Sequence, residues 1–261
     1  KQIVCENWRN LISVGAKPIA ITNCLNFGNP ENPKIMGQFA ECLLGIKEAC
    51  EFLDYPVVSG NVSFYNGTNK KNIDPTPVIG GVGLIQNTKN KINHLLKKEG
   101  NIILQIGKTF GHLHQSVFFK EVYSIIDGPP PDINLSNEKS NGETVLNLIK
   151  NKLVSSAHDV SSGGLILALA EMSMCSGFGL KIEKPSKLSN LMEYYFGEDQ
   201  GRYLLEIESK NLQMIRAILV ENNIFNEIIA TVQTDNFEIS NELKININDL
   251  YKINNKWYNN Y

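Results

Sequence analysis

Residues 57–66, with the sequence VVSGNVSFYN, are the stretch from which the fold of this 261-residue chain is best predicted. Their valines and aromatic residues predict a β-strand, but small and amide side chains stand among them. Gly60 lies inside this strand, where glycine weakens the structure and a β-branched or aromatic residue would pack better. We therefore expect another molecule to approach the backbone closely at Gly60.

Two polar side chains of this strand suggest what that molecule is. Side chains alternate across a strand, so Asn61 and Ser63 point to the same face. Asn61 offers a neutral carbonyl oxygen to a hard cation such as Mg2+, and Gly60 leaves room for a phosphate group. A purely structural alternative is a β-bulge with a turn-capping asparagine. The residue types alone leave both interpretations open.

The segments around this strand predict a first α/β unit. The expected helices, from apolar side chains at helical spacing, are residues 2–14 and 33–52. The expected strands are 18–22, 57–66 and 76–85, the last two as a hairpin-like pair, with an irregular turn-rich stretch over 23–30. Charged residues from Lys89 to Glu99 predict a boundary, so we expect domains at 1–96 and 97–261.

The rest of the chain alternates strands and helices, which predicts a second α/β domain. The expected strands are 102–107, 178–183, 202–208 and 226–232, and the expected helices are 114–124, 141–151, 163–176 and 212–220. Gly128-Pro129-Pro130-Pro131-Asp132 predicts an extended surface loop. The Asn- and Lys-rich tail after Ser240 is expected to be solvated surface with short apolar anchors.

Composition excludes several classes of protein. The formal net charge of -2 gives no field that would gather nucleic acid or anionic lipid, so neither partner is expected. No apolar run approaches the ~20 residues that span a bilayer, so no membrane segment is expected. The chain begins at Lys1 without a signal-peptide pattern, and we expect it to be part of a longer protein.

The cysteines predict structural thiols in a reducing, cytoplasmic location. None forms a CxxC pair, and none stands with histidines at zinc-site spacing. The five are Cys5, Cys24, Cys42, Cys50 and Cys175. His112 and His114 are likewise too few for a zinc site without distant help.

Two further clusters suggest binding chemistry. The segment from His158 to Leu165 precedes an apolar helix, so its free N–H groups would suit either an anion or a helix cap. His158 beside Asp159 is better explained as a packed or surface histidine than as an acid/base pair. In the stretch 196–203, FGEDQGRY, the two carboxylates would suit a metal ion, or Arg202 would pair with one of them in a solvated turn.

Longer strings connect these observations to a known family. The matching strings are Ile21 to Glu31, Met36 to Phe39, Val57 to Asn66, Pro75 to Gly83, Gly128 to Pro131, His158 to Ser161, Gly163 to Leu165 and Phe196 to Arg202. In this order they closely resemble the synthetase subunit family of phosphoribosylformylglycinamidine synthase, small-type PurL. This family belongs to the aminoimidazole-ribonucleotide-synthetase-like superfamily, whose PurL members carry two tandem copies of an N-domain and a C-domain.

The resemblance implies the second copy only: the end of a linker helix, an N-domain with a mixed sheet and an α/β C-domain. It implies the ATP-dependent conversion of formylglycinamide ribonucleotide (FGAR) and ammonia to the amidine (FGAM), ADP and phosphate in purine biosynthesis. The implied partners are a glutaminase subunit (PurQ), a small bridging subunit (PurS) and the N-terminal half of the same synthetase.

The resemblance also assigns residues, with ATP and Mg2+ as cofactors. The family's ATP contacts match Asn23 and Gly60, its magnesium ligand matches Asn61, and its substrate contact matches Ser63. Its catalytic histidines belong to the first N-domain, and His158 matches neither, so no catalytic residue is expected here. We expect the chain to supply half of a composite ATP site and to lack synthetase activity alone.

Two expectations concern association. Superfamily members pair the sheets of their N-domains, so the first domain is expected to expose an apolar sheet face and the isolated chain to form a homodimer. The alternative to a partial active site is a non-catalytic, pseudo-symmetric scaffold half with auxiliary nucleotide binding. Binding of ATP with Mg2+ that is lost in Asn61→Ala would support the partial active site, and no binding at all would support the scaffold.

Overall fold

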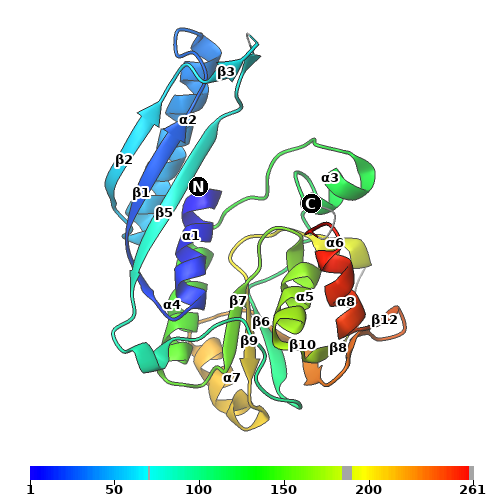
Figure 1. Ribbon diagram of the computed structural model, residues 1–261. Coiled ribbons are helices and arrows are strands. Elements are labelled where there is room, and N and C mark those ends of the chain that lie inside the picture. The colour runs from blue at the N-terminus through cyan, green and yellow to red at the C-terminus, as the bar shows by residue number, and fades with distance from the viewer. Residues whose placement is uncertain (70, 184–189, 259–261) are drawn as a thin grey trace.

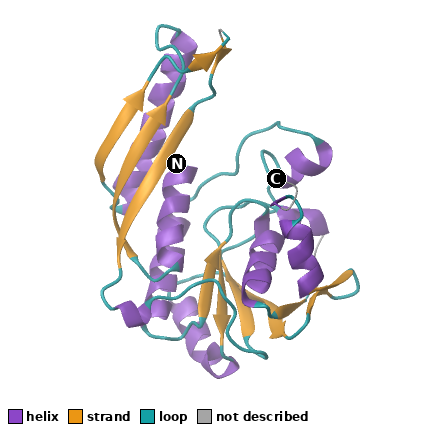
Figure 2. Ribbon diagram, in the orientation of Figure 1, coloured by secondary structure: helices purple, strands orange, loops and turns teal. Residues whose placement is uncertain are grey.

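Two separate sheets, each with its own helices, form the architecture of the computed structural model, which describes residues 1–69, 71–183 and 190–258 (Figure 1). The first sheet has three strands and the second has seven, with a two-stranded hairpin beside the first. Figure 2 shows helices on both sheets, so the fold is a mixed α/β fold as predicted.

The first sheet is built around a central strand. Strand β1 (Lys17–Asn26) pairs in parallel with β2 (Val57–Ser63) and antiparallel with β5 (Thr76–Leu84). The predicted hairpin-like pairing of the second and third strands is therefore wrong. Strand β1 also continues to Asn26, beyond the predicted end at residue 22, because both neighbouring strands pair with it there.

Helices α1 (Gln2–Ser13) and α2 (Pro33–Leu53) cover one face of this sheet. Pro33 stands at the first turn of α2, and the Asn32 side chain accepts the Lys34 N–H, so the sequence defines the start of the helix. A hairpin of β3 (Gly67–Thr68) and β4 (Lys71–Asn72) follows β2. The core under the sheet includes Ile21, Leu25 and Phe27.

The opposite face of the sheet is open. Its exposed apolar side chains, between 44% and 56% accessible, are Ile19, Val78, Val82 and Leu84. This is the apolar face that the sequence predicted.

The second sheet has the order β12-β11-β8-β10-β6-β9-β7 and is antiparallel except between β11 and β8. Its strands are β6 (Ile102–Ile106), β7 (Ser156–Asp159), β8 (Gly179–Ile182), β9 (Tyr203–Ile207), β10 (Asn226–Gln233), β11 (Asn236–Ile239) and β12 (Leu243–Asn246). Its helices are α3 (Val117–Tyr123), α4 (Leu135–Lys150), α5 (Gly164–Ser176), α6 (Leu191–Phe196), α7 (Leu212–Glu221) and α8 (Ile247–Asn255).

Side chains of the central strands alternate between two cores. In β9, Tyr203, Leu205 and Ile207 face the core shared with α1, α4 and α7, whereas Leu204 faces the core under α5 and α8. Because α1 packs on β5 as well as on α4 and β7, it lies between the two sheets. The two sheets are thus joined by packing as well as by the chain.

The sequence missed five elements of this second unit, one of which is helix α6 (Leu191–Phe196). Strand β7 carries polar His158 and Asp159 in its four residues, and β11, β12 and α8 lie in or next to the Asn-rich tail that was expected to be surface. Helix α4 also begins at Leu135, earlier than predicted, because the Asn134 side chain caps it. These segments are only four to nine residues long, and in runs this short periodicity does not separate a strand from a helix or a loop.

Two short 3-10 turns complete the described elements, η1 (Thr88–Asn90) and η2 (Ser209–Asn211). The first begins the segment that leads from β5 to β6. The proline-rich segment 128–132 is a loop, as predicted. In the described part of the chain, no helix combines the length and the apolar character needed to cross a membrane.

Candidate functional site

The first pair of predicted site residues lies across two neighbouring strands. Asn23 of β1 stands beside Gly60 of β2 in the parallel register. A Cβ at position 60 would collide with the Asn23 side chain, so Asn23 folds over the glycine. Asn23 also lines an open cleft of about 850 Å³ between α2 and the start of β2. The absence of a side chain at Gly60 is therefore required for this arrangement.

The second pair, Asn61 and Ser63, lies on β2, on the face opposite to Gly60. Alternation along β2 places Asn61 and Ser63 together and opposite to Gly60. The Asn61 side chain is exposed and makes no hydrogen bond with any residue that the structure describes. Ser63 is half-buried, and its hydroxyl lies 3.1 Å from the Asn66 amide nitrogen. The structure thus groups Asn23 with Gly60 and Asn61 with Ser63.

The strand also contains the β-bulge of the structural alternative, but not at Gly60. The register shifts so that Ile21 pairs with Val57 and Thr22 with Ser59, which leaves Val58 as the extra residue. Asn61 caps no turn. Its free amide remains available as the predicted oxygen ligand for a cation.

The predicted anion site at the start of α5 is filled by a side chain of the protein. Gly163, with φ of 79°, caps the helix, and its N–H donates to Glu198 Oε1 over 2.8 Å. The same oxygen accepts the Val117 N–H at the start of α3, also over 2.8 Å. Glu198 therefore stabilises the first turns of both helices, where the helix dipole favours a negative charge.

The Asp199 carboxylate also accepts hydrogen bonds from the protein backbone. Its carboxylate accepts the backbone N–H groups of Phe110 and Gly111 over 2.9 and 2.8 Å, and that of His112 over 3.3 Å. The proposal of metal ligands at Glu198 and Asp199 thus has no support from the geometry. No cluster of three metal-ligating side chains occurs within residues 1–69, 71–183 and 190–258.

Arg202 is fully buried rather than part of a solvated turn. Its guanidinium donates to the carbonyl oxygens of Asp199 and Gly197 over 2.9 and 2.6 Å, and to the Thr109 hydroxyl over 3.0 Å. Burial lowers its pKa to about 10, so the group keeps its charge at neutral pH. The stretch 197–202 therefore positions the loop 109–117 through the hydrogen bonds of Glu198, Asp199 and Arg202.

Arg9, which the sequence analysis did not single out, connects the stretch 197–202 to helix α1 beside the first sheet. Arg9 of α1 is fully buried, and its Nη1 lies 2.6 Å from Glu138 Oε1 of α4. Its Nη2 donates to Gln200 Oε1 over 2.8 Å. Burial acts to lower the pKa of Arg9, but the Glu138 carboxylate reverses the effect and raises it. An arginine within the apolar stripe of α1, next to Trp8, was the available signal.

This ion pair is incompletely hydrogen-bonded. Arg9 Nε, Glu138 Oε2 and the Tyr203 hydroxyl have no partner among the residues that the structure describes. Burial raises the pKa of Tyr203 well above its usual value, which keeps the phenol neutral. Polar groups without a hydrogen-bond partner are costly in a core, so the ion pair adds little net stability.

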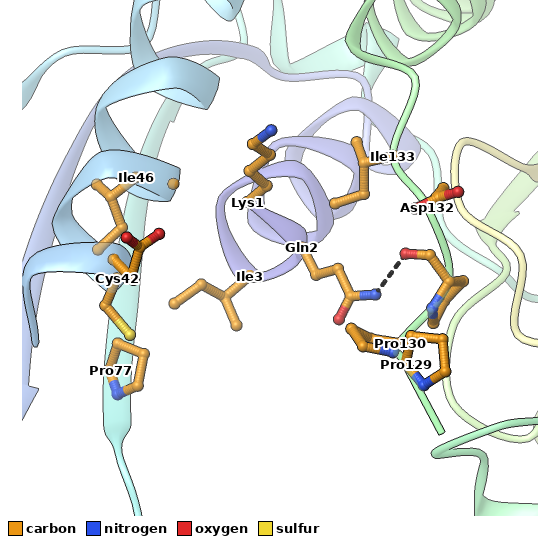
Figure 3. A pocket seen from close by; sticks show the side chains of 13 residues that line it. Lys1, Gln2, Ile3, Cys42, Ile46, Pro77, Pro129, Pro130, Asp132 and Ile133 are labelled. Atoms are coloured by element: carbon orange, nitrogen blue, oxygen red, sulfur yellow. Dashed lines mark hydrogen bonds between the residues drawn. The ribbon is translucent and has the colours of Figure 1, made fainter. Parts of the chain in front are cut away.

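A cleft of about 560 Å³ opens where α1 begins (Figure 3). It lies between α1, α2 and the proline-rich loop, with Ile3, Ile46 and Pro77 among its apolar walls. Gln2 Nε2 donates to the Pro131 carbonyl oxygen over 3.0 Å. None of the predicted site residues lines this cleft.

The remaining candidates have structural explanations. His158 is largely buried, which is the packed one of the two expected alternatives. All five cysteines are free thiols, and burial raises the pKa of Cys5 to about 12, which makes it a poor nucleophile.

Comparison with known proteins supports the family resemblance. Residues 1–85 match the family described as AIR synthase related protein, N-terminal domain, and residues 98–240 match its C-terminal domain. The phosphoribosylformylglycinamidine synthase subunit PurL of Pelagibacter ubique is 54% identical over 261 residues. The PurL subunit of Bradyrhizobium diazoefficiens is 45% identical over 262 residues. In both cases the chain spans 36% of the relative's length.

Solved structures share the fold. Thermotoga maritima PurL complexed with FGAR superimposes with a TM-score of 0.72 at 17% identity, over 95% of this chain and 42% of that one. Escherichia coli HypE, a hydrogenase maturation protein, superimposes with a TM-score of 0.70 at 14% identity, over 94% of this chain and 77% of that one. The expected fold and the expected resemblance to PurL subunits are confirmed. This chain belongs to the family of AIR synthase related proteins.

Proposed function

We propose that this chain contributes to the ATP-dependent synthesis of formylglycinamidine ribonucleotide from FGAR and ammonia in purine biosynthesis. The observation that carries the proposal is the strand with Gly60 and Asn61 in a chain whose whole length is 54% identical to a PurL subunit. T. maritima PurL has been solved in complexes with ATP, with ADP and with FGAR, and these ligands support the substrates proposed here.

The residues of β2 fit the proposed cofactors. Asn61 presents an unpartnered amide oxygen, which suits Mg2+, and the Asn23 side chain, which lies over Gly60, also lines the cleft beside α2. We assign Asn23 and Gly60 to ATP, Asn61 to the metal ion and Ser63 to the substrate. ATP supplies the phosphoryl group that activates the amide oxygen of FGAR for attack by ammonia.

The proposal places the catalytic residues in the N-terminal half of the synthetase and includes further subunits. We place the domains at 1–96 and 97–261 and assign no catalytic residue to this chain. The catalytic half, a glutaminase subunit and a small bridging subunit are the proposed partners. A T. maritima assembly solved under the name PurLQS supports such subunits.

Titration calorimetry with ATP and Mg2+ tests this assignment. We expect the chain to bind the pair, and Asn61→Ala to weaken binding by about tenfold or more, because a direct metal ligand is lost. The exposed Asn248→Ala on α8 is the matched control and is expected to leave binding unchanged. With FGAR and ammonium added, the chain alone is expected to release no ADP.

The outcomes separate the proposal from its alternative. Absence of binding would favour the non-catalytic scaffold, which the open apolar sheet face also suits. Binding that Asn61→Ala leaves unchanged would refute the metal assignment. Turnover by the chain alone would refute the placement of the catalytic residues in the N-terminal half.

The apolar sheet face predicts self-association of the chain. We expect a dimer in sedimentation velocity at high protein concentration, because Val78, Val82 and Leu84 would lose contact with water in it. Val82→Lys is expected to shift the protein to monomer. Val220→Lys, at an exposed position on α7, is the control; a dimer that survives Val82→Lys would argue against this face.

A further inference from the structure

The connecting segment, residues 85–101, leads from β5 to β6 and runs along the free edge of β7. Strand β7 is the last strand of the second sheet and pairs only with β9 among the described strands. On its other side, the Ala157 N–H donates to the Asn93 carbonyl oxygen over 3.1 Å. Farther along the segment, the Lys97 N–H donates to Glu206 over 3.0 Å. The segment therefore covers an edge that would otherwise be open.

Two imidazole rings meet where the segment crosses β7. The rings of His94, from the segment, and His158, from β7, have their centroids 5.3 Å apart. His158 Nε2 lies 3.1 Å from Glu171 Oε2 of α5, and its Nδ1 lies 3.5 Å from Asp159 Oδ1. His94 has no carboxylate within ion-pair distance in the described part of the chain. A positive charge is thus favoured on one ring only.

The pKa shifts agree with this geometry. Burial acts to lower the pKa of His158, but hydrogen bonds with Asp159 and Glu171 raise it to about 9. Burial lowers the pKa of His94, and the charge of His158 lowers it further. At neutral pH a neutral His94 ring therefore packs against a charged His158 ring.

We propose that the His94–His158 contact is an acid-sensitive clasp, which holds the connecting segment on the edge of β7 and loosens when His94 becomes protonated. A second positive charge 5.3 Å from the first would repel it. The charged groups that face the pair are Asp159 of β7, Glu171 of α5 and Lys97 of the segment itself. Asp159 also interacts electrostatically with Arg9 of α1.

The two histidines define a pH window with opposite limits. The folded-state pKa of His94 lies below its usual 6.5, so the contribution of His94 is present above that pH and is lost as the pH falls below it. The folded-state pKa of His158 is raised, so its contribution is present below 6.5 and is lost as the pH rises through about 9. The contact between the two rings is therefore expected to be most stable between pH 6.5 and about pH 9.

Proton NMR of the four histidines tests the clasp, with signals assigned from single variants. We expect His94 to titrate below 6.5, and His158→Gln to raise that midpoint by about 0.5 pH units or more. Glu171→Gln, at an exposed position, is expected to move it the other way, because Glu171 favours the charged form of His94. His114→Gln is the control, because His114 lies against His112 rather than this pair.

Hydrogen exchange provides the conformational readout. After correction for intrinsic exchange, protection of the Ala157 amide is expected to fall several-fold between pH 7 and pH 5.5, and to fall less in His158→Gln. A His94 midpoint at or above 6.5 would overturn the proposal. Protection of Ala157 that does not change with pH would overturn it as well.

Discussion

Replacement of Arg9 by Met is expected to lower the free energy of unfolding by about 3–5 kcal/mol. Arg9 is fully buried, and Glu138, with 1% of its side chain accessible, faces it across 2.6 Å. Without the guanidinium, the Glu138 carboxylate would remain in the core without its counter-charge, and Gln200 Oε1 would lose its donor. The loss follows from an uncompensated buried charge rather than from the strength of the pair.

Urea unfolding of a double-mutant cycle measures this effect. Glu138→Met alone is expected to cost a similar amount, whereas Arg9→Met with Glu138→Met is expected to be closer to the native stability than either single variant. Arg216→Met, at an exposed position of α7, is the matched control and should change stability by less than about 0.5 kcal/mol. Additive losses in the double variant would contradict this account.

Replacement of Asp199 by Asn is expected to cost about 3 kcal/mol. The carboxylate accepts three backbone N–H groups, from Phe110, Gly111 and His112. An asparagine has the same shape, but its single oxygen cannot serve all three donors, and its NH2 group would face an N–H. The loop 109–117 would then lose one of the side chains that position it.

Thermal or urea unfolding gives the magnitude, and hydrogen exchange gives the location. The amides of Phe110 and Gly111 are expected to lose protection before those of β9, because the loss is local. Asp132→Asn is the control, since Asp132 is exposed and makes no side-chain hydrogen bond among the described residues. Equal stability losses in the two variants would show that the three hydrogen bonds are not responsible.

The longer helices and strands were predictable because their own residues specify them. Asn32 and Pro33 define the start of α2, and the apolar spacing of α1 is strong. At Gly60 the structure excludes a side chain because Asn23 of the same chain lies over it, and the approach of another molecule there stays a prediction. The assignments of Asn23, Gly60, Asn61 and Ser63 to ligands stay predictions.

The order and pairing of the strands were not predictable from the residues of each strand. Strand β1 lies between β2 and β5, because the order of strands depends on contacts across the sheet rather than on nearness in sequence. Strand β7 was missed because its four residues include His158 and Asp159, and the neighbouring strand β9 decides its conformation.

The sequence alone determined the family resemblance, the principal helices and the strand with Gly60, since local spacing and long strings specify them. Only the tertiary structure decided what the charged residues do. Glu198 and Asp199 resembled ligands for a metal ion, but their oxygens accept backbone N–H groups from segments more than 30 residues away. A carboxylate takes its role from the donors that folding brings to it, and the sequence does not record that proximity.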